Sequence, residues 1–230
     1  MMVDIVQVLG TANGKFDCVS GLCINSAQYI YVSDRNNHRV QIFDRYGRFI
    51  RTLGSTGDEG ELKHPCGIAV DNLGHVYVCD KETNRIVVFH ESGRYMRSFG
   101  TRGTGQVQFD KPSAIALTTD NRLVISDTSN HRIQICDPFG IFFLTFGSEG
   151  TENGYFKSPR GVTVDSEGFI LVADSGNSRI QIFRSDGTFV CPFGCDGTSA
   201  GQFRQPEGLT VMSNGDVVIA DKENHRIQIM

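Results

Sequence analysis

Features that would place this chain in a membrane, secretory or nucleic-acid-binding class are absent from its sequence. No stretch of about 18 uncharged apolar residues, the length that spans a bilayer as a helix, occurs anywhere. The first residues, 1–7, contain neither a basic cluster nor an apolar run of the kind that directs export. We therefore expect a cytoplasmic protein with no membrane partner.

The chain also lacks the excess of positive charge that attracts polyanions. Its formal net charge is −4, so the molecule as a whole attracts neither nucleic acid nor an anionic membrane surface. Binding to such a partner would require a local basic patch. We expect no DNA partner.

Paired cysteines of the Cys-x-x-Cys type, which structural zinc sites and thiol redox motifs commonly use, are missing. The seven cysteines are Cys18, Cys23, Cys66, Cys79, Cys136, Cys191 and Cys195. An odd number fits poorly with the alternative of a secreted disulfide framework, and a chain of this length builds a core without such bridges. We predict reduced, mostly buried thiols.

One pattern recurs five times along the chain, and no segment shows a helical period. Each copy has an aspartate at the end of an apolar run, an arginine five residues later and an apolar residue eighteen residues earlier. The aspartates are Asp34, Asp80, Asp127, Asp174 and Asp221; the arginines are Arg39, Arg85, Arg132, Arg179 and Arg226; the apolar residues are Phe16, Leu62, Phe109, Phe156 and Phe203. Three landmarks held in register five times define a true repeat.

Within each copy, short runs rich in Val, Ile and Phe alternate with Gly, Asn, Asp and Ser turns, which predicts a four-stranded antiparallel meander. Meanders of 46 or 47 residues that stack radially form a β-propeller. We therefore predict an all-β fold, a single propeller domain over residues 1–230. The repeats are bounded at about 11–54, 55–100, 101–147, 148–194 and 195–230.

The two ends of the chain complement each other. The last repeat stops at its third strand, 226–230, while residues 4–10 resemble fourth strands such as 49–54. The N-terminal segment is therefore predicted to complete the last blade, which would remove free strand edges and close the propeller with five blades.

The repeated motifs resemble the NHL repeat over nearly the whole chain. Pro-x-Gly-(Val/Ile)-x-Val-Asp, Val-Ala-Asp and Asn-His-Arg-Ile-Gln-Ile carry the resemblance, the last at residues 130–135 and 224–229. Linkers such as 146–156 look most like those in the C-terminal propeller of tripartite-motif proteins, which carry RING, B-box and coiled-coil segments upstream. That family usually has six blades, so a fragment or short isoform lacking one blade is the alternative to closure with five. No RING or B-box cysteine pattern is present, so ligase activity does not reside in these residues.

An enzyme is a further possibility by resemblance, because amidating lyases also use an NHL-like propeller and bind metal in it. Their export signal and disulfides have no visible counterpart in this sequence. The chain has no Gly-x-Ser-x-Gly nucleophile motif, no phosphate loop and no isolated carboxylate pair outside the repeat. We predict a non-catalytic chain that uses no cofactor.

The repeated polar residues are expected to be structural. The five aspartates and arginines named above can pair across the turn between the second and third strands and bond turn amides. His38, His131 and His225 precede three of those arginines, and a propeller would hold them at wide angles. A zinc site needs ligands that converge within about 2.1 Å of one metal. We therefore expect turn histidines that bond locally, and no metal.

Recognition is expected at positions that change between blades, in the second-to-third-strand loops and the blade-to-blade linkers, which share one face. The cations there form a broken basic ring: Arg35, Lys63, Lys81, Arg102, Lys111, Lys157, Arg160, Arg204 and Lys222. Tyr155, beside Lys157 and Arg160 in the sequence, is the best candidate to stack on a base. The strand aromatics Tyr31, Phe43, Phe89 and Phe183 are assigned to packing.

Two functional hypotheses remain. The first is a protein-recognition platform, which by resemblance would select ubiquitination substrates or partners for a tripartite-motif E3 ubiquitin ligase. Acidic residues in the same loops bring the face close to neutral, which suits a protein partner. The alternative is sequence-specific binding of single-stranded RNA, as in NHL repressors of translation, which would depend on how the cations cluster.

Overall fold

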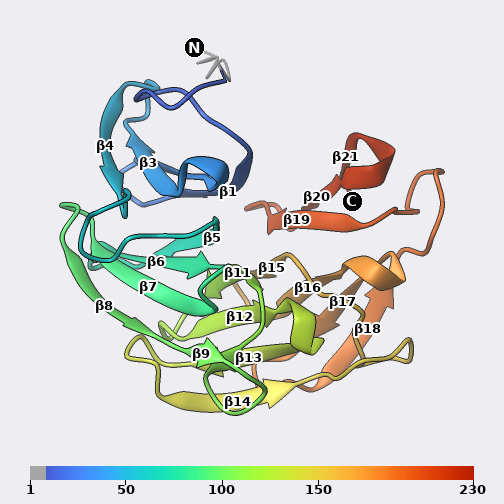
Figure 1. Cartoon of the computed structure of the whole chain (residues 1–230). Coiled ribbons are helices and arrows are strands. Elements are labelled where there is room, and N and C mark those ends of the chain that lie inside the picture. Colours follow the sequence, from blue (N-terminus) through green and yellow to red (C-terminus); the bar gives the residue numbers. More distant parts are fainter. Residues whose placement is uncertain (1–8) are drawn as a thin grey trace. The chain divides into compact units, whose positions relative to one another are not determined.

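The computed structural model describes residues 9–230, and these form an all-β chain (Figure 1). The prediction that no segment is helical is confirmed: the helical elements among the described residues are four single 3-10 turns. No helix in this part of the chain is long and apolar enough to span a membrane. The chain divides into two compact units, Met1–Arg102 and Gly103–Met230, and each is described by itself.

The first unit contains two four-stranded antiparallel sheets, blades 1 and 2, each a meander in chain order. Blade 1 consists of β1 (Val19–Ile24), β2 (Ile30–Asp34), β3 (Arg39–Phe43) and β4 (Phe49–Leu53). Blade 2 consists of β5 (Pro65–Val70), β6 (His75–Asp80), β7 (Arg85–His90) and β8 (Tyr95–Phe99), and the short strand β9 (Thr101–Arg102) follows it.

The second unit contains blades 3, 4 and 5, preceded by the short strand β10 (Gln108–Phe109). Blade 3 consists of β11 (Pro112–Leu117), β12 (Leu123–Asp127), β13 (Arg132–Cys136) and β14 (Phe142–Phe146). Blade 4 consists of β15 (Val162–Val164), β16 (Ile170–Asp174), β17 (Arg179–Phe183) and β18 (Phe189–Phe193). Blade 5 consists of β19 (Pro206–Val211), β20 (Val217–Asp221) and β21 (Arg226–Ile229). Within residues 9–230 blade 5 is three-stranded, and residues 4–8 of the predicted closing strand lie outside the described residues.

The turn between the second and third strands has the same conformation in four blades. A single 3-10 turn fills it: η1 (Arg35–Asn37), η2 (Thr128–Asn130), η3 (Ser175–Asn177) and η4 (Lys222–Asn224). Each turn ends on a residue in the left-handed region, such as His38 at φ 55° or Ser178 at φ 55°. The turn brings the repeat aspartate directly opposite the repeat arginine in the strand register, as in Asp34 and Arg39.

The core lies between adjacent blades of the same unit. Val40 of β3 shares one buried cluster with Val76 of β6, and Ile133 of β13 shares another with Val172 of β16. Burying one such side chain contributes about 2 kcal/mol. The repeat apolar residues are all buried, as is each strand aromatic that the sequence assigned to packing, so these packing predictions are confirmed.

Glycines in or directly before two first strands let neighbouring blades approach closely. A Cβ atom on Gly21 of β1 would lie 2.0 Å from the carbonyl oxygen of Cys66 in blade 2. A Cβ atom on Gly161, directly before β15, would lie 2.2 Å from the carbonyl oxygen of Glu207 in blade 5. Both distances are far inside van der Waals contact, so only glycine fits.

None of the seven cysteines forms a disulfide, but the prediction that most are buried is wrong. Cys66, Cys79 and Cys136 are buried, whereas Cys18, Cys191 and Cys195 are exposed and Cys23 is intermediate. Cys18 lies directly before β1, Cys191 lies in β18, the outer strand of blade 4, and Cys195 lies in the linker after β18. Burial raises the pKa of the Cys136 thiol to about 12, which keeps that thiol protonated.

Candidate binding face

The repeat aspartate organises the turn end of every blade through both carboxylate oxygens. In blade 4, Asp174 Oδ1 accepts the backbone N–H of Lys157 at 2.7 Å, which ties the incoming linker to the blade. Asp174 Oδ2 accepts from Arg179 Nε at 2.8 Å, from Asn177 Nδ2 at 2.9 Å and from Gln181 Nε2 at 3.0 Å. The arginine and the glutamine also donate to the carbonyl of Tyr155. The network thus binds the linker, the turn and two strands to one buried carboxylate.

Blade 2 departs from this arrangement. Thr83 and Val87 occupy the places of the asparagine and glutamine found in the other four blades, and Arg85 Nε lies 3.4 Å from Asp80 Oδ2. Burial raises the pKa of Asp80, and the remaining hydrogen bonds do not offset it. In blade 5, by contrast, hydrogen bonds from Arg204 N–H, Asn224 and Arg226 outweigh burial and lower the pKa of Asp221.

Two of the turn histidines link adjacent blades rather than bonding within their own turn. His38 Nδ1 accepts the backbone N–H of His64 at 3.2 Å, and the two imidazole rings lie 4.8 Å apart. His131 Nδ1 likewise accepts the N–H of Ser158 at 3.0 Å. The expectation of local bonding is therefore corrected for both residues: the left-handed turn aims each ring at the next blade. Within residues 9–230 no three His, Cys, Asp or Glu side chains are grouped so as to hold a metal ion.

The second-to-third-strand turns and the blade-to-blade linkers meet at one end of the blades in each unit, which we call the linker face. In the second unit Gly176 N–H donates to the carbonyl of Lys157, and Glu223 N–H donates to that of Arg204. In the first unit Glu82 N–H donates to the carbonyl of Lys63, and Arg35 N–H to that of Cys18. The predicted cations Lys81, Arg102 and Lys111 lie directly after β6, in β9 and directly before β11.

Carboxylates of the same face partner some of its cations in the second unit. Arg160 forms an ion pair with Glu207 of the next blade. The other carboxylate oxygen of Glu207 lies 3.8 Å from Lys222 Nζ, which is also 3.6 Å from a carboxylate oxygen of Glu223. Charges of both signs therefore alternate along this part of the linker face.

A hollow of about 250 Å³ opens on the linker face between blades 4 and 5. It is lined by Ser175, Gly176, Ser178, Asp196, Arg204, Gln205 and Glu223. Lys157 lies at its edge, because a Cβ atom on Gly176 would touch the Lys157 side chain. The structure thus places Arg204 in the lining of the hollow with Lys157 beside it, and directs Arg160 to a carboxylate. Tyr155 is 45% exposed on the same linker as Lys157.

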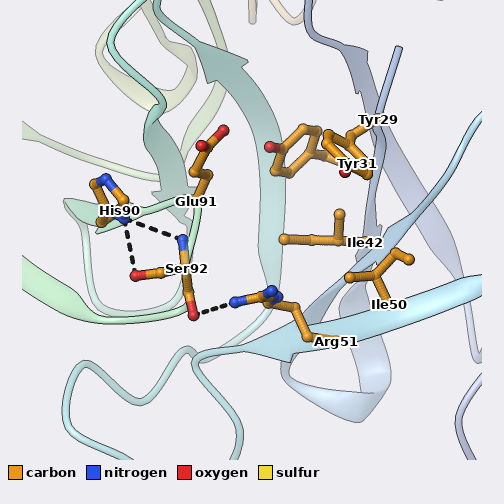
Figure 2. A pocket seen from close by; sticks show the side chains of 8 residues that line it. All are labelled: Tyr29, Tyr31, Ile42, Ile50, Arg51, His90, Glu91 and Ser92. Carbon is orange, nitrogen blue, oxygen red and sulfur yellow. Dashed lines mark hydrogen bonds between the residues drawn. The ribbon is translucent and has the colours of Figure 1, made fainter. Parts of the chain in front are cut away.

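A second hollow, between blades 1 and 2 of the first unit, involves residues that the sequence reasoning did not single out for binding (Figure 2). It is lined by Tyr29, Tyr31, Ile42, Ile50, Arg51, His90, Glu91 and Ser92. These residues come from the first-to-second and third-to-fourth-strand turns and the strands beside them, at the end of the blades away from the linker face. Variation between repeats is the feature of the sequence that could have identified this hollow. The position of Tyr29 holds His75, Arg122, Phe169 and Asp216 in the other copies.

The fold and the repeated carboxylate network define a repeat propeller whose variable residues lie in loops. The model of the family described as NHL repeat matches residues 16–43, 62–89, 109–136, 156–183 and 203–230. These segments make up more than half of the chain, so the chain belongs to the NHL-repeat family, and the resemblance drawn from its motifs is confirmed.

Two curated proteins are similar to parts of the chain. Protein brain tumor of Drosophila melanogaster is 42% identical over 57 residues, which are 24% of this chain and 6% of that protein. B-box type zinc finger protein ncl-1 of Caenorhabditis elegans is 48% identical over 40 residues, which are 17% of this chain and 5% of that protein. The matched segments thus span a small part of the relatives' lengths.

Solved structures share the fold at low sequence identity. A catalytically inactive virginiamycin B lyase from Staphylococcus aureus, solved with quinupristin, has a TM-score of 0.68 and 18% identity. The likeness covers 92% of this chain and 69% of the lyase. At that identity it shows a common fold and assigns no chemistry to this chain.

Proposed function

We propose that this chain is a non-catalytic recognition module that binds a protein partner through the linker face of its second unit. By its likeness to tripartite-motif NHL proteins, the partner would include ubiquitination substrates of a ligase whose RING lies outside this sequence, acting in the cytoplasm. Of the ten residues named in the sequence analysis, six lie in the second unit and are proposed to contact the partner, with Lys157 and Arg204 at the centre: Lys111, Tyr155, Lys157, Arg160, Arg204 and Lys222.

The observation that supports a protein partner is the alternation of charge on this face. Glu207 and Glu223 partner Arg160 and Lys222 there, and Asp196 and Glu223 line the same hollow as Arg204. A phosphate backbone would be repelled by these carboxylates, whereas a folded protein surface offers both signs of charge and fits such a pattern. The hollow between blades 4 and 5 supplies a concave, mixed-charge contact.

A single-stranded RNA partner is the second candidate, and one observation favours it. Tyr155 presents an exposed ring on the linker that also carries Lys157, which is exposed. An aromatic ring beside a cation can stack on a base and hold the adjacent phosphate. This arrangement is local, so it would suit a short motif rather than a long strand.

Reversing charge at the hollow tests the proposed face. The double variant Lys157→Glu, Arg204→Glu should lose proteins that the wild-type chain captures from a cell extract, because both cations would become repulsive to an acidic contact. Quantitative mass spectrometry of the captured proteins measures the loss. Arg184→Glu is the matched control, since Arg184 is exposed on the third-to-fourth-strand turn of blade 4, away from the linker face.

Two results would contradict the proposal. If the double variant captures the same proteins as the wild type, the linker face of this unit is not the contact surface. If the Arg184→Glu control loses them equally, the effect comes from net charge rather than from a defined site.

A further inference from the structure

The hollow between blades 1 and 2 combines aromatic, aliphatic and acidic groups in a space of about 220 Å³ (Figure 2). Blade 1 supplies Tyr29, Tyr31, Ile42, Ile50 and Arg51, and the third-to-fourth-strand turn of blade 2 supplies His90, Glu91 and Ser92. Because all of these residues belong to the first compact unit, the site is built within one body.

The apolar wall of this cleft is held in place by its own strands. The Tyr31 ring is 1% exposed and packs in the same cluster as Ile42, while the Tyr29 ring is 38% exposed at the rim. Asn25 positions both tyrosines, because its Oδ1 accepts the N–H of Tyr29 at 2.9 Å and its Nδ2 donates to the Tyr31 hydroxyl at 3.3 Å. Ile50 lies beside them, partly exposed.

The acidic group is Glu91, whose carboxylate faces the cleft opposite the Tyr31 hydroxyl in Figure 2. Its side chain lies over Gly74: a Cβ atom there would be 2.9 Å from Glu91 Cδ. Among residues 9–230 no Lys, Arg or His forms an ion pair with Glu91. Burial, and next the negative charge of Glu91, raise the pKa of Tyr31 to about 12, so its hydroxyl stays protonated.

The two basic residues of the cleft, Arg51 and His90, bond to the backbone of Ser92 in the third-to-fourth-strand turn of blade 2. Arg51 donates to the carbonyl of Ser92 (Figure 2). His90 Nδ1 accepts the Ser92 N–H at 3.1 Å. In Figure 2 the Arg51 guanidinium lies away from the Glu91 carboxylate, across the cleft.

From this arrangement we infer that the cleft binds a lysine or arginine side chain of a protein partner. The aliphatic stem packs against the exposed Ile50, beside the buried Ile42, as long basic side chains do along apolar surfaces. The charged head lies between the exposed Tyr29 ring and the Glu91 carboxylate, where cation–π and ionic attraction act together.

The other repeats do not build this combination. The position of Glu91 holds Arg45, Pro138 and Ser185 in three other copies. The corresponding hollow between blades 4 and 5 is lined mainly by Phe169, Leu171, Ile182, Val190, Val211 and Val217. Its one carboxylate, Asp165, accepts N–H bonds within its own turn. The cleft between blades 1 and 2 therefore offers a cation a counter-charge and an exposed aromatic ring, and the hollow between blades 4 and 5 does not.

The site lies at the opposite end of the blades from the linker face and in the other compact unit from the proposed contact surface. Its test uses different residues and a different probe. If the cleft does not bind a basic side chain, the proposed function of the linker face is unaffected. If the linker face does not bind a protein, the inference about the cleft is unaffected.

Methyl NMR of the whole 230-residue chain with labelled isoleucines tests the inference. The probes are three blocked pentapeptides, Ser-Leu-X-Leu-Ser, in which X is lysine, arginine or norleucine. The lysine or the arginine peptide should shift the methyl signals of Ile42 and Ile50. The norleucine peptide, which keeps the stem and lacks the charge, should bind about fivefold more weakly.

Paired variants separate the contributions of the carboxylate and the ring. Glu91→Gln should weaken binding of the basic peptide about fivefold, whereas Glu59→Gln, at an exposed glutamate on the linker before blade 2, should not. Tyr29→Phe should retain binding and Tyr29→Leu should lose it, because only the former keeps the ring. The isoleucine methyl spectrum of each free variant shows that it is folded.

The inference is overturned if the basic peptides leave the Ile42 and Ile50 signals unchanged. It is equally overturned if norleucine binds as tightly as lysine and arginine, or if Glu91→Gln has no effect in a folded variant.

Discussion

The five repeat aspartates do not have equal surroundings, although they occupy the same position. In blades 1, 3, 4 and 5 a glutamine seven residues later donates to the carboxylate, whereas in blade 2 the residue is Val87. Each glutamine also accepts an N–H from the linker, as Gln41 does from Gly14. Asp80 thus has fewer hydrogen bonds to its charged form, and burial raises its pKa.

Val87→Gln should supply the missing contacts in blade 2. The equivalent partners are present: the Glu61 carbonyl, which already accepts from Arg85, the Asp80 carboxylate, and the Gly60 N–H. We expect the pKa of Asp80 to fall and the free energy of unfolding at pH 7 to rise by about 1 kcal/mol. NMR titration and urea unfolding measure the two effects. Val87→Met, which has similar length and no donor, should instead destabilise through overpacking.

The sign of the pH dependence follows from the direction of the shift. A raised pKa means that folded Asp80 binds its proton more tightly than the unfolded chain does, so its contribution to stability falls as the pH rises through the folded pKa. In Val87→Gln the folded pKa should be lowered, so the contribution is present at neutral pH and is lost as the pH falls through it. If the free energy of unfolding of Val87→Gln depends on acidic pH in the same way as that of the wild type, the introduced glutamine does not bond to Asp80.

At the scale of the strand, contact between blades depends on glycines, which have no side chain, as much as on side chains that pack. The first strands of blades 4 and 5 run close together, and Gly161 faces the Glu207 carbonyl. Ser175 of the adjacent turn donates to the carbonyl of Pro206 in the same neighbouring strand. In blade 4 the glycine of the Pro-x-Gly motif therefore lies where one backbone approaches another, which glycine alone permits.

Gly161→Ala should destabilise the second unit by about 2 kcal/mol, because a Cβ atom would overlap the backbone of blade 5, which cannot rotate away as a side chain can. Gly208→Ala is the control at the same repeat position: its Cβ would meet nothing closer than Ala220 at 3.9 Å. That variant should change stability by less than about 0.5 kcal/mol. Thermal unfolding of both variants provides the measurement, and equal shifts would refute the backbone contact.

For the molecule as a whole, the net charge of −4 limits how it can hold a polyanion. Nucleic-acid binding by this chain would have to use a few cations close to Tyr155, since carboxylates partner Arg160 and Lys222. Any such binding would therefore involve few phosphates and a shallow dependence on salt compared with basic proteins.

Selection from a randomised single-stranded RNA pool at about 0.15 M salt distinguishes the two candidate partners. If the chain is a protein-recognition module, no motif should be enriched from a sample that unfolds cooperatively. Enrichment of a short motif that is lost in a Tyr155→Ala, Lys157→Ala variant would instead establish RNA recognition. In that case binding should fall with salt, and each lost phosphate contact should lower the slope by about one unit.

The sequence by itself determined the repeat, the strands and the family, because these depend on the order of residues within each repeat. Alternating apolar residues select strands, and Asp34 and Arg39 lie opposite each other as soon as one short turn forms between two strands. The burial of Phe156 and its four counterparts follows for the same reason, since each recurs at a fixed place in a unit that must bury one face.

Only the tertiary structure decided which side chains of different blades meet. His38 bonds to a residue 26 positions away, and Arg160 pairs with Glu207 across 47 positions. The cleft that unites Tyr29 with Glu91 likewise joins two blades, and nothing in either repeat alone indicates the other. Such contacts depend on how one sheet packs against the next, and that packing is set by whole blade surfaces rather than by the spacing of residues along the chain.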